Sequence, residues 1–341
     1  MNPQPTLVLS LALALGAASC GAEAPKKKGE KTDVKVEAKT ADVKADVKAD
    51  AKADAKADAK AETPPDPALL DRGKYLAEVV MNCHACHTPL TDKGPDLDKQ
   101  YAGGLEYPDA FGTWRSPNIT QDKRTGIGAW SDEQIITAVR RGIRPSGEQM
   151  YPVMPYEYFA AASDDDMKAL VAYLRTIKPI EHAVAGNTDL KLTKPPPPEP
   201  TGDPPLPEPV AEGKYLVELA HCGDCHTPLA ADGRPDKARL LAGGRPYAAL
   251  PFQGTGQVWS ANLTPHPTGI GKYTDEQLMT AITELDKRDG SAIVGPMTFY
   301  VGAWSQLKHK DVKAIVAYLR SLPPIENAVP KTTWAPRAAG G

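Results

Sequence analysis

An internal duplication limits the folds open to this chain more than any other feature of its sequence. Six short segments of the first half return in the same order in the second half, so the two halves must be copies of one structural unit. A proline-rich stretch at 194–209 separates the copies and predicts a semi-rigid polyproline II linker, because proline runs form neither a helix interior nor a central strand. We therefore predict one domain at 64–193, a second at 210–330 and a tail at 331–341. The returning segments are GKYLAE at 73–78 (GKYLVE at 213–218), CHTPL at 86–90 (225–229), AGG at 102–104 (242–244), Asn-x-Thr with TGIG at 118–128 (262–271), DEQ at 132–134 (275–277) and VAYLR at 171–175 (316–320).

The N-terminus predicts export of the protein. Residues 7–16 are apolar but too few to span a bilayer, which takes about 20 helical residues, and the small residues at 17–19 precede Cys20. We therefore predict an export signal peptide at 1–19. This segment also resembles a bacterial lipoprotein box, in which the cysteine after the cleavage site carries lipid, so we expect lipidation at Cys20. The segment lacks the usual basic residues and has Ala17 where that family usually has Leu, and ordinary signal peptidase would also accept the site.

Residues 20–63 predict a disordered Lys/Ala/Asp tether. The tetrapeptide ADVK or ADAK occurs five times between Ala41 and Lys60. Its period of four places like charges at i and i+4, where they repel on a helix, and it leaves no apolar stripe to bury. The whole chain has a formal net charge of −3, which gives no reason to expect nucleic acid as a partner.

Both halves predict helices joined by long loops. A helix at Leu69–Met81 leads to a cysteine pair, and Ser131-x-x-Gln134 and Thr274-x-x-Gln277 match capping boxes that open a second helix in each half. No stretch alternates convincingly as a strand, and segments 91–130 and 230–272 are expected to be irregular. Loops that long need something large to pack on. The apolar face of the last helix in each half has the spacing i, i+3, i+4, i+7 and consists of Met167, Leu170, Val171 and Leu174 or of Val312, Ile315, Val316 and Leu319.

The two cysteine pairs carry the chemistry. Cys83 and Cys86 are followed at once by His87, and Cys222 and Cys225 by His226. Zinc ribbons space their pairs by about 15–20 residues, and redox pairs sit in a βαβ pattern, which is absent here. The C-x-x-C-H order is the signature of covalent c-type haem, with each thiol bound to a vinyl group and the histidine as axial ligand. We therefore predict two covalently bound haems, with His87 and His226 on the irons and His84 as a bystander.

These motifs together resemble class I cytochromes c. The likeness is greatest to the tandem dihaem cytochromes that accept electrons in periplasmic alcohol and gluconate dehydrogenases, and it covers about residues 66–184 and 209–330. It implies an all-α fold of two tandem cytochrome c domains, each with a few helices and long loops around one haem. It also implies a close crossing of the first and last helices at Gly73 and Gly213, against Tyr173 and Tyr318.

The sixth iron ligand in each half is expected to be a methionine. Aligning Gly147 with Gly290 places Met154 and Met297 at the same position, seven residues further on, and Met150 has no methionine counterpart. Both selected methionines also match the axial position of the resembled family. The histidines that could compete, at 182, 266 and 309, have no counterpart in the other half.

His–Met ligation predicts an electron carrier rather than an enzyme, because both axial positions are filled. We expect transfer of single electrons between a donor dehydrogenase or complex and a terminal acceptor, with a dehydrogenase, an oxidase or a small cytochrome as redox partners. The location would be the periplasm or the outer face of a membrane, held there by the lipid on Cys20. The alternative is a dihaem redox enzyme of the peroxidase or thiosulfate-oxidising type, which needs one exchangeable axial position.

Overall fold

The computed structural model describes residues 66–92, 94–109, 112–187, 205–231, 233–248 and 254–336. These residues all belong to one compact unit, Ala61–Gly341. The signal peptide predicted at 1–19, the tether at 20–63, Cys20 and most of the proline linker lie outside the described residues, so those assignments stay predictions.

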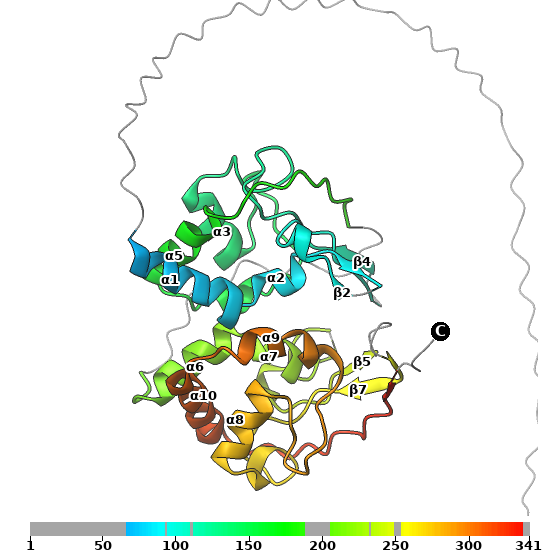
Figure 1. The fold of residues 1–341 in the computed structure, drawn as a ribbon. Coiled ribbons are helices and arrows are strands. Elements are labelled where there is room, and N and C mark those ends of the chain that lie inside the picture. The colour runs from blue at the N-terminus through cyan, green and yellow to red at the C-terminus, as the bar shows by residue number, and fades with distance from the viewer. Residues whose placement is uncertain are drawn as a thin grey trace, which may run out of the picture. The chain divides into compact units, whose positions relative to one another are not determined.

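Each half is a small group of helices that carries long loops (Figure 1). The first half contains α1 (Pro67–Lys74), η1 (Tyr75–Val80), α2 (Cys83–Cys86), η2 (Leu97–Lys99), α3 (Asp132–Arg141), α4 (Tyr156–Phe159) and α5 (Asp164–Leu174). The second contains α6 (Val210–Leu219), α7 (Cys222–His226), η3 (Lys237–Arg239), η4 (Ile270–Lys272), α8 (Asp275–Thr283), η5 (Gly295–Phe299), α9 (Val301–Trp304) and α10 (His309–Ser321). The all-α class is thereby confirmed. Among the described residues, no helix has the length and apolar character needed to cross a membrane.

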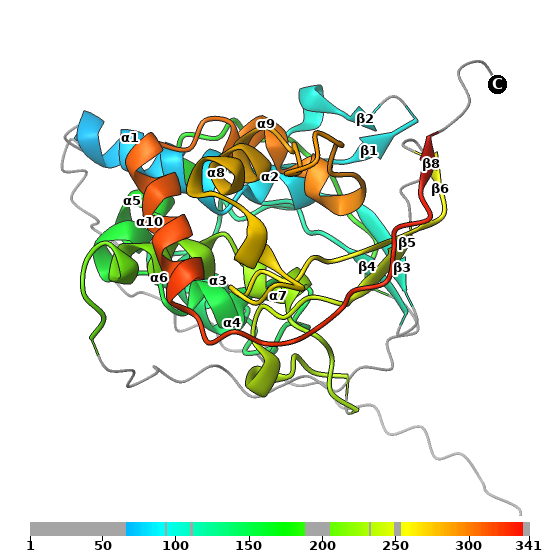
Figure 2. The same ribbon diagram turned by 90° about the horizontal axis from the view of Figure 1, so that it is seen from below.

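The first and last helices of each half pack against one another, α1 on α5 and α6 on α10 (Figures 1 and 2). All eight residues predicted for the apolar faces of α5 and α10 are buried. A Cβ added at Gly73 would lie 1.9 Å from the carbonyl oxygen of Ala169, and one at Gly213 would lie 1.9 Å from that of Ala314. Only glycine permits backbones to approach so closely, so the predicted helix crossing is confirmed in both halves.

Both predicted capping boxes are present. The Ser131 hydroxyl accepts from the backbone N–H of Gln134 at 3.2 Å, and the Gln134 side chain accepts from the N–H of Ser131 at 2.8 Å. Thr274 and Gln277 make the same pair of bonds at the start of α8. These bonds satisfy donors that the helix itself leaves free. The capping boxes therefore set where α3 and α8 begin.

The expectation that segments 91–130 and 230–272 are irregular is wrong in part. Short antiparallel pairs lie inside the segments that were expected to be irregular: Glu106 faces Arg115 and Pro246 faces Trp259 across two such pairs. Each strand has two to four residues, which is too short for an alternating pattern to stand out in a sequence. The pairs are β1 (Leu90–Thr91) with β2 (Gly94–Pro95), β3 (Glu106–Asp109) with β4 (Gly112–Arg115), β5 (Pro246–Ala248) with β7 (Gln257–Trp259), and β6 (Gly254–Thr255) with β8 (Ala335–Pro336).

The helix that leads to the first cysteine pair ends in a wide π turn, η1. The N–H of Met81 donates to the carbonyl of Leu76, five residues earlier, at 2.8 Å. At the corresponding place in the second half, Ala220 donates to Leu216, four residues earlier, also at 2.8 Å. The first copy has one more residue between its GKYL segment and its cysteine pair than the second copy has. The π turn takes up this extra residue, since such turns add one residue to a helix without breaking it.

Candidate functional site

Each cysteine pair lies on one short helical turn. The residue before the first cysteine is left-handed in both copies, with φ of 49° at Asn82 and 42° at His221, so the chain turns sharply into α2 and α7. The side chains of all four cysteines are partly buried on these turns.

The two motif histidines have the form that a metal ligand needs. The Nδ1 of His87 lies 2.8 Å from the carbonyl oxygen of Pro117, and the Nδ1 of His226 lies 2.8 Å from that of Ala261. A carbonyl only accepts, so Nδ1 carries the proton and Nε2 keeps its lone pair for a metal. Burial lowers the pKa of both rings, against the opposing effect of the carbonyl. The backbone carbonyl thus holds each imidazole ring in one orientation.

The AGG segments bring these carbonyls into place. The N–H of Gly103 donates to the carbonyl of His87 at 2.7 Å, and Gly103 has φ of 72°. A Cβ there would lie 2.3 Å from the carbonyl carbon of Pro117. Gly243 repeats the arrangement, 2.6 Å from the carbonyl of His226. Glycine is needed at these positions because the chain must pass this close behind each histidine, a role that sequence reasoning did not assign.

The Asn-x-Thr motif joins this loop to the segment that follows the last helix of each half. The buried Asn118 accepts from the N–H of Thr120 at 2.9 Å and donates to the carbonyl of Ile180 at 2.8 Å. Asn262 makes the corresponding bonds to Thr264 and Ile325 at 2.9 and 2.8 Å. Asn118 and Asn262 each come directly after the residue whose carbonyl supports the histidine. Their hydrogen bonds therefore fix the position of that carbonyl. The repeated sequence was the signal for it.

The two methionines chosen from the sequence occupy partly buried positions. Met154 precedes α4 and packs against the main apolar core, while Met297 lies in η5 beside Ala220 and Trp304. Their role as axial ligands stays a prediction, as do the roles of the four cysteines and of His87 and His226. Within the described ranges, no group of three or more His, Cys, Asp or Glu side chains could hold a metal ion.

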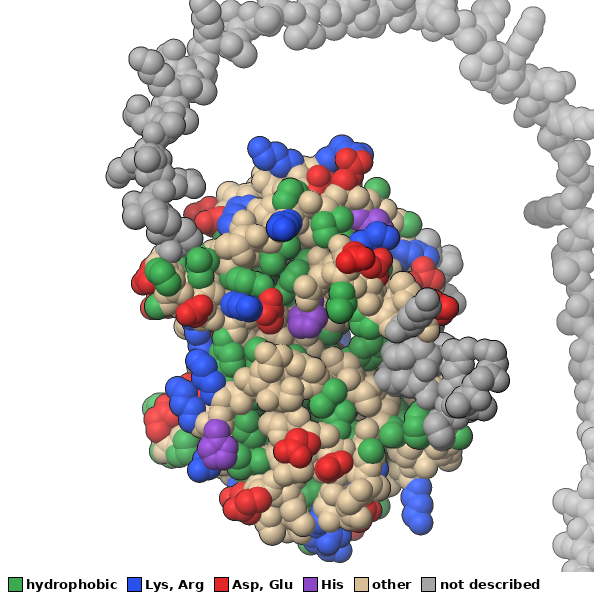
Figure 3. Space-filling model, viewed as in Figure 1, with side chains coloured by type: hydrophobic (Ala, Val, Ile, Leu, Met, Phe, Trp, Pro, Cys, Tyr) green, Lys and Arg blue, Asp and Glu red, His purple; other side chains and the backbone are tan. Residues whose placement is uncertain are grey.

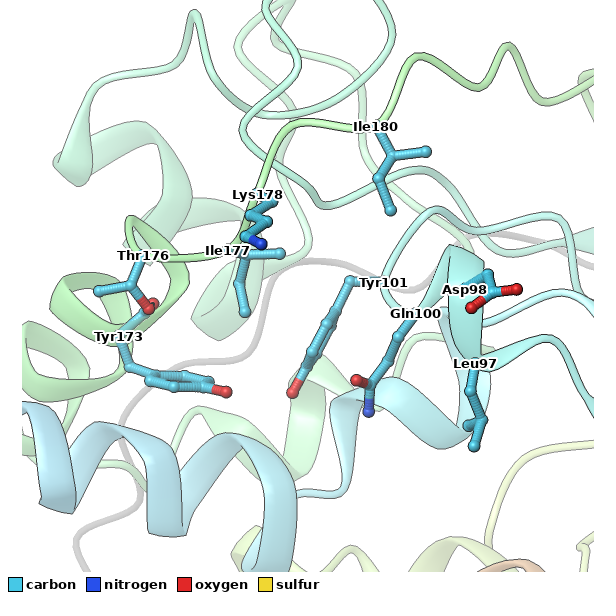
Figure 4. A pocket seen from close by; sticks show the side chains of 9 residues that line it. All are labelled: Leu97, Asp98, Gln100, Tyr101, Tyr173, Thr176, Ile177, Lys178 and Ile180. Carbon is cyan, nitrogen blue, oxygen red and sulfur yellow. The ribbon is translucent and has the colours of Figure 1, made fainter.

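A surface pocket of about 300 Å³ marks one difference between the halves. Figure 4 shows the hydroxyls of Tyr101 and Tyr173 pointing toward one another in this pocket. The Tyr173 hydroxyl also donates to Glu78. Leu241 stands at the position of Tyr101 in the second half, so the pair of hydroxyls belongs to the first half alone. The surroundings of the two attachment motifs are therefore not identical.

The molecular face shown in Figure 3 carries acidic and basic side chains interspersed among apolar ones. The formal net charge of the whole chain is only −3. Large single-sign fields steer association by electrostatics, and this face shows no broad area of one sign among its described residues.

Two helical units that each present a C-x-x-C-H turn with a carbonyl-supported histidine define a c-type haem protein. The chain matches the cytochrome c family over residues 70–178 and 210–323. It belongs to the cytochrome c family, and it carries two covalently bound c-type haems. Because the donor set of each half fits this cofactor, we assign each cysteine pair and its histidine to one haem as a prediction.

The chain is also similar to cytochrome subunits of larger enzymes. It is 35% identical to the cytochrome c subunit of alcohol dehydrogenase (quinone) from Gluconobacter oxydans, over 76% of this chain and 56% of that protein. It is 35% identical to the gluconate 2-dehydrogenase cytochrome c subunit of Pantoea cypripedii, over 75% and 60% respectively. A dihaem cytochrome c of Cereibacter sphaeroides is 33% identical over 72% of this chain and 83% of its own length. These likenesses imply electron transfer.

Proposed function

We propose that this chain is a periplasmic dihaem cytochrome that passes single electrons from a donor dehydrogenase to a terminal acceptor such as an oxidase or small cytochrome. The observation that supports this most is the duplication of the whole binding frame, including the Pro117 and Ala261 carbonyls behind the two histidines. The named dehydrogenase subunits among its relatives support the donor. The chain spans little more than half the length of those relatives, so the donor belongs to the proposal.

The protein's part in this activity is to bind, orient and shield. Bound haem supplies a one-electron iron couple. The cysteines anchor the cofactor, and the carbonyl behind each histidine holds the ring in one tautomer and one orientation. Met154 and Met297 would fill the remaining axial positions, which leaves no place for a substrate on the metal. His87 and His226 are buried, and this burial would keep water away from an iron bound to them.

Spectroscopy of the purified holoprotein tests this function. We expect two haems per chain, uptake of one electron by each, and a methionine-to-iron charge-transfer band from both centres in the oxidised protein. High-spin iron in either half would contradict the electron-carrier proposal and would favour the dihaem peroxidase or thiosulfate-oxidising alternative. Reduction of the holoprotein by a purified quinone-type alcohol or gluconate dehydrogenase with its substrate would support the donor, and a lack of reduction would contradict it.

We also propose export and lipid anchoring through Cys20. Several lipid chains hold a protein stably at a membrane, whereas one chain does so only marginally. Anchoring would keep the haem domains near membrane-bound partners and so raise their effective concentration. Cell fractionation of the full chain and of a Cys20→Ala variant tests this step. Wild type should sediment with membranes and the variant should be released, and equal distribution would contradict the anchor.

A further inference from the structure

Two tyrosines cross reciprocally between the halves. The hydroxyl of Tyr75, in the first half, donates to the carboxylate of Asp311 in α10 at 2.7 Å and accepts from the N–H of Lys308 at 3.1 Å. The hydroxyl of Tyr215, in the second half, donates to Asp166 in α5 and accepts from the N–H of Ser163 at 3.1 Å. Tyr75 and Tyr215 occupy the same place in the repeat. Each half therefore grips the start of the other half's last helix.

This arrangement is that of a two-fold symmetric interface, in which the same pair of residues meets on both sides of the axis. Both carboxylates are buried, with Asp311 at 2% and Asp166 at 8% exposure. A buried carboxylate that loses a hydrogen-bond donor still bears the free-energy cost of its removal from water. Each tyrosine hydroxyl therefore stabilises the contact between the halves. The two tyrosine–aspartate contacts differ in the charge beside them. Arg72 also donates two hydrogen bonds of 2.7 and 2.6 Å to Asp166, whereas Glu212 stands at the position of Arg72 in the second copy.

The same interface reaches the second cysteine turn. A Cβ added at Gly223, between the two cysteines, would lie 2.8 Å from the ring of Tyr158, so α4 of the first half lies directly on this turn. Phe159 meets His221, the residue before the first cysteine, edge to face at 5.9 Å. Since α4 begins two residues after Met154, one short segment joins the methionine side of the first site to the cysteine side of the second.

The residues at the positions of Gly223 and Tyr158 differ in size between the two halves. The first motif has His84 where the second has Gly223. Counted from the last helix of each half, Ala303 stands at the position of Tyr158. The first half thus has a ring at both positions, His84 and Tyr158, and the second half has a small residue at both, Gly223 and Ala303. The two surfaces are therefore specialised for each other rather than interchangeable.

We propose that Tyr75 and Tyr215 are positioning residues that lock the two halves in one arrangement, with Tyr158 seated on the second cysteine turn, and that this arrangement sets the rate of electron exchange between the two redox centres. The inference rests on the proposed function. One electron leaves the centre of one half and enters that of the other, so one is oxidised as the other is reduced and no covalent bond changes. The tyrosines take no part in the step itself.

The test uses full-length holoprotein with both hydroxyls removed, Tyr75→Phe with Tyr215→Phe. Tyr173→Phe is the matched control, because it removes a tyrosine–carboxylate hydrogen bond that lies within one half. Amide hydrogen exchange at the start of α5 and α10 reports opening of the interface. Exchange broadening of haem NMR signals in half-reduced protein reports electron transfer between the halves, and spectroelectrochemistry reports the two potentials.

In the double variant we expect interface opening to rise about tenfold or more, as for loss of hydrogen bonds to charged groups, and electron exchange between the halves to slow. The two potentials and the haem content of the double variant should remain at wild-type values, and the control should match wild type in amide exchange at the start of α5 and α10. Unchanged amide exchange would refute the lock, and faster amide exchange with an unchanged electron-exchange rate would refute its link to the redox centres. Tyr158→Ala, which leaves both locks intact, should slow electron exchange without opening the interface. Loss of the electron-carrier function would appear separately, as a wild-type spectrum with high-spin iron.

Discussion

Replacing Gly73 by alanine tests whether the helix crossing holds the first half together. The added Cβ would lie 1.9 Å from the carbonyl oxygen of Ala169, although Cβ contacts under 3.0 Å are essentially never found. The obstacle is backbone, so α1 and α5 must separate, and a gap of ~0.5–1 Å forfeits a quarter to a half of the dispersion attraction across it. Overpacking costs about 1–3 kcal/mol, and we expect the upper end here. Alanine recovers about 1 kcal/mol of helix propensity, which leaves a net loss of about 2 kcal/mol.

Urea unfolding of the holoprotein, followed by circular dichroism and haem absorbance, measures this loss. Gly302→Ala is the control, because Gly302 lies in a helix with no atom within 4 Å of its added Cβ. That variant should be as stable as wild type or gain about 0.5–1 kcal/mol. Gly213→Ala, at the second crossing, should lose as much as Gly73→Ala. If Gly73→Ala proved as stable as the control, the crossing could not be the tight backbone contact described above.

Three further predictions concern single side chains. Asn118→Ala should lower the free energy of unfolding by about 1–3 kcal/mol, since it removes the acceptor of the buried Thr120 N–H and the shorter of the two hydrogen bonds to the carbonyl of Ile180, and urea titration measures this. Burial acts to raise the pKa of Asp166, but the hydrogen bonds from Arg72 and Tyr215 outweigh it and lower that pKa. The ionised Asp166 therefore contributes fully to stability above its unfolded pKa of about 4, and this contribution is lost as pH falls through the lower folded pKa. Asp166→Asn should flatten the stability profile below about pH 4, and an unchanged acid limb would contradict this. Met154→Ala should remove the charge-transfer band of one centre and leave two haems attached, as absorption spectra and haem content would show.

Much of the helical frame could be predicted from the sequence. The apolar spacing of α5 and α10 and both capping boxes were visible because side chains alone encode them. The carbonyls of Pro117 and Ala261 could not be identified, since a backbone acceptor leaves no signal of its own in a sequence. Only the neighbouring glycines and the Asn-x-Thr motif pointed to a constrained loop. The reciprocal tyrosines were equally hidden, because each is part of an ordinary amphipathic helix and its partner lies in the other copy.

The π turn before Cys83 has a consequence for the direction in which the first cofactor faces. Each added residue of an α-helix rotates everything after it by about 100°. One inserted residue would therefore have swung the first cysteine pair away from its histidine support. Because the wide turn takes up the additional residue, the helix is one residue longer but the chain leaves it in the same direction. The two copies have thus diverged in length at this point while both present their attachment turn to the same internal frame.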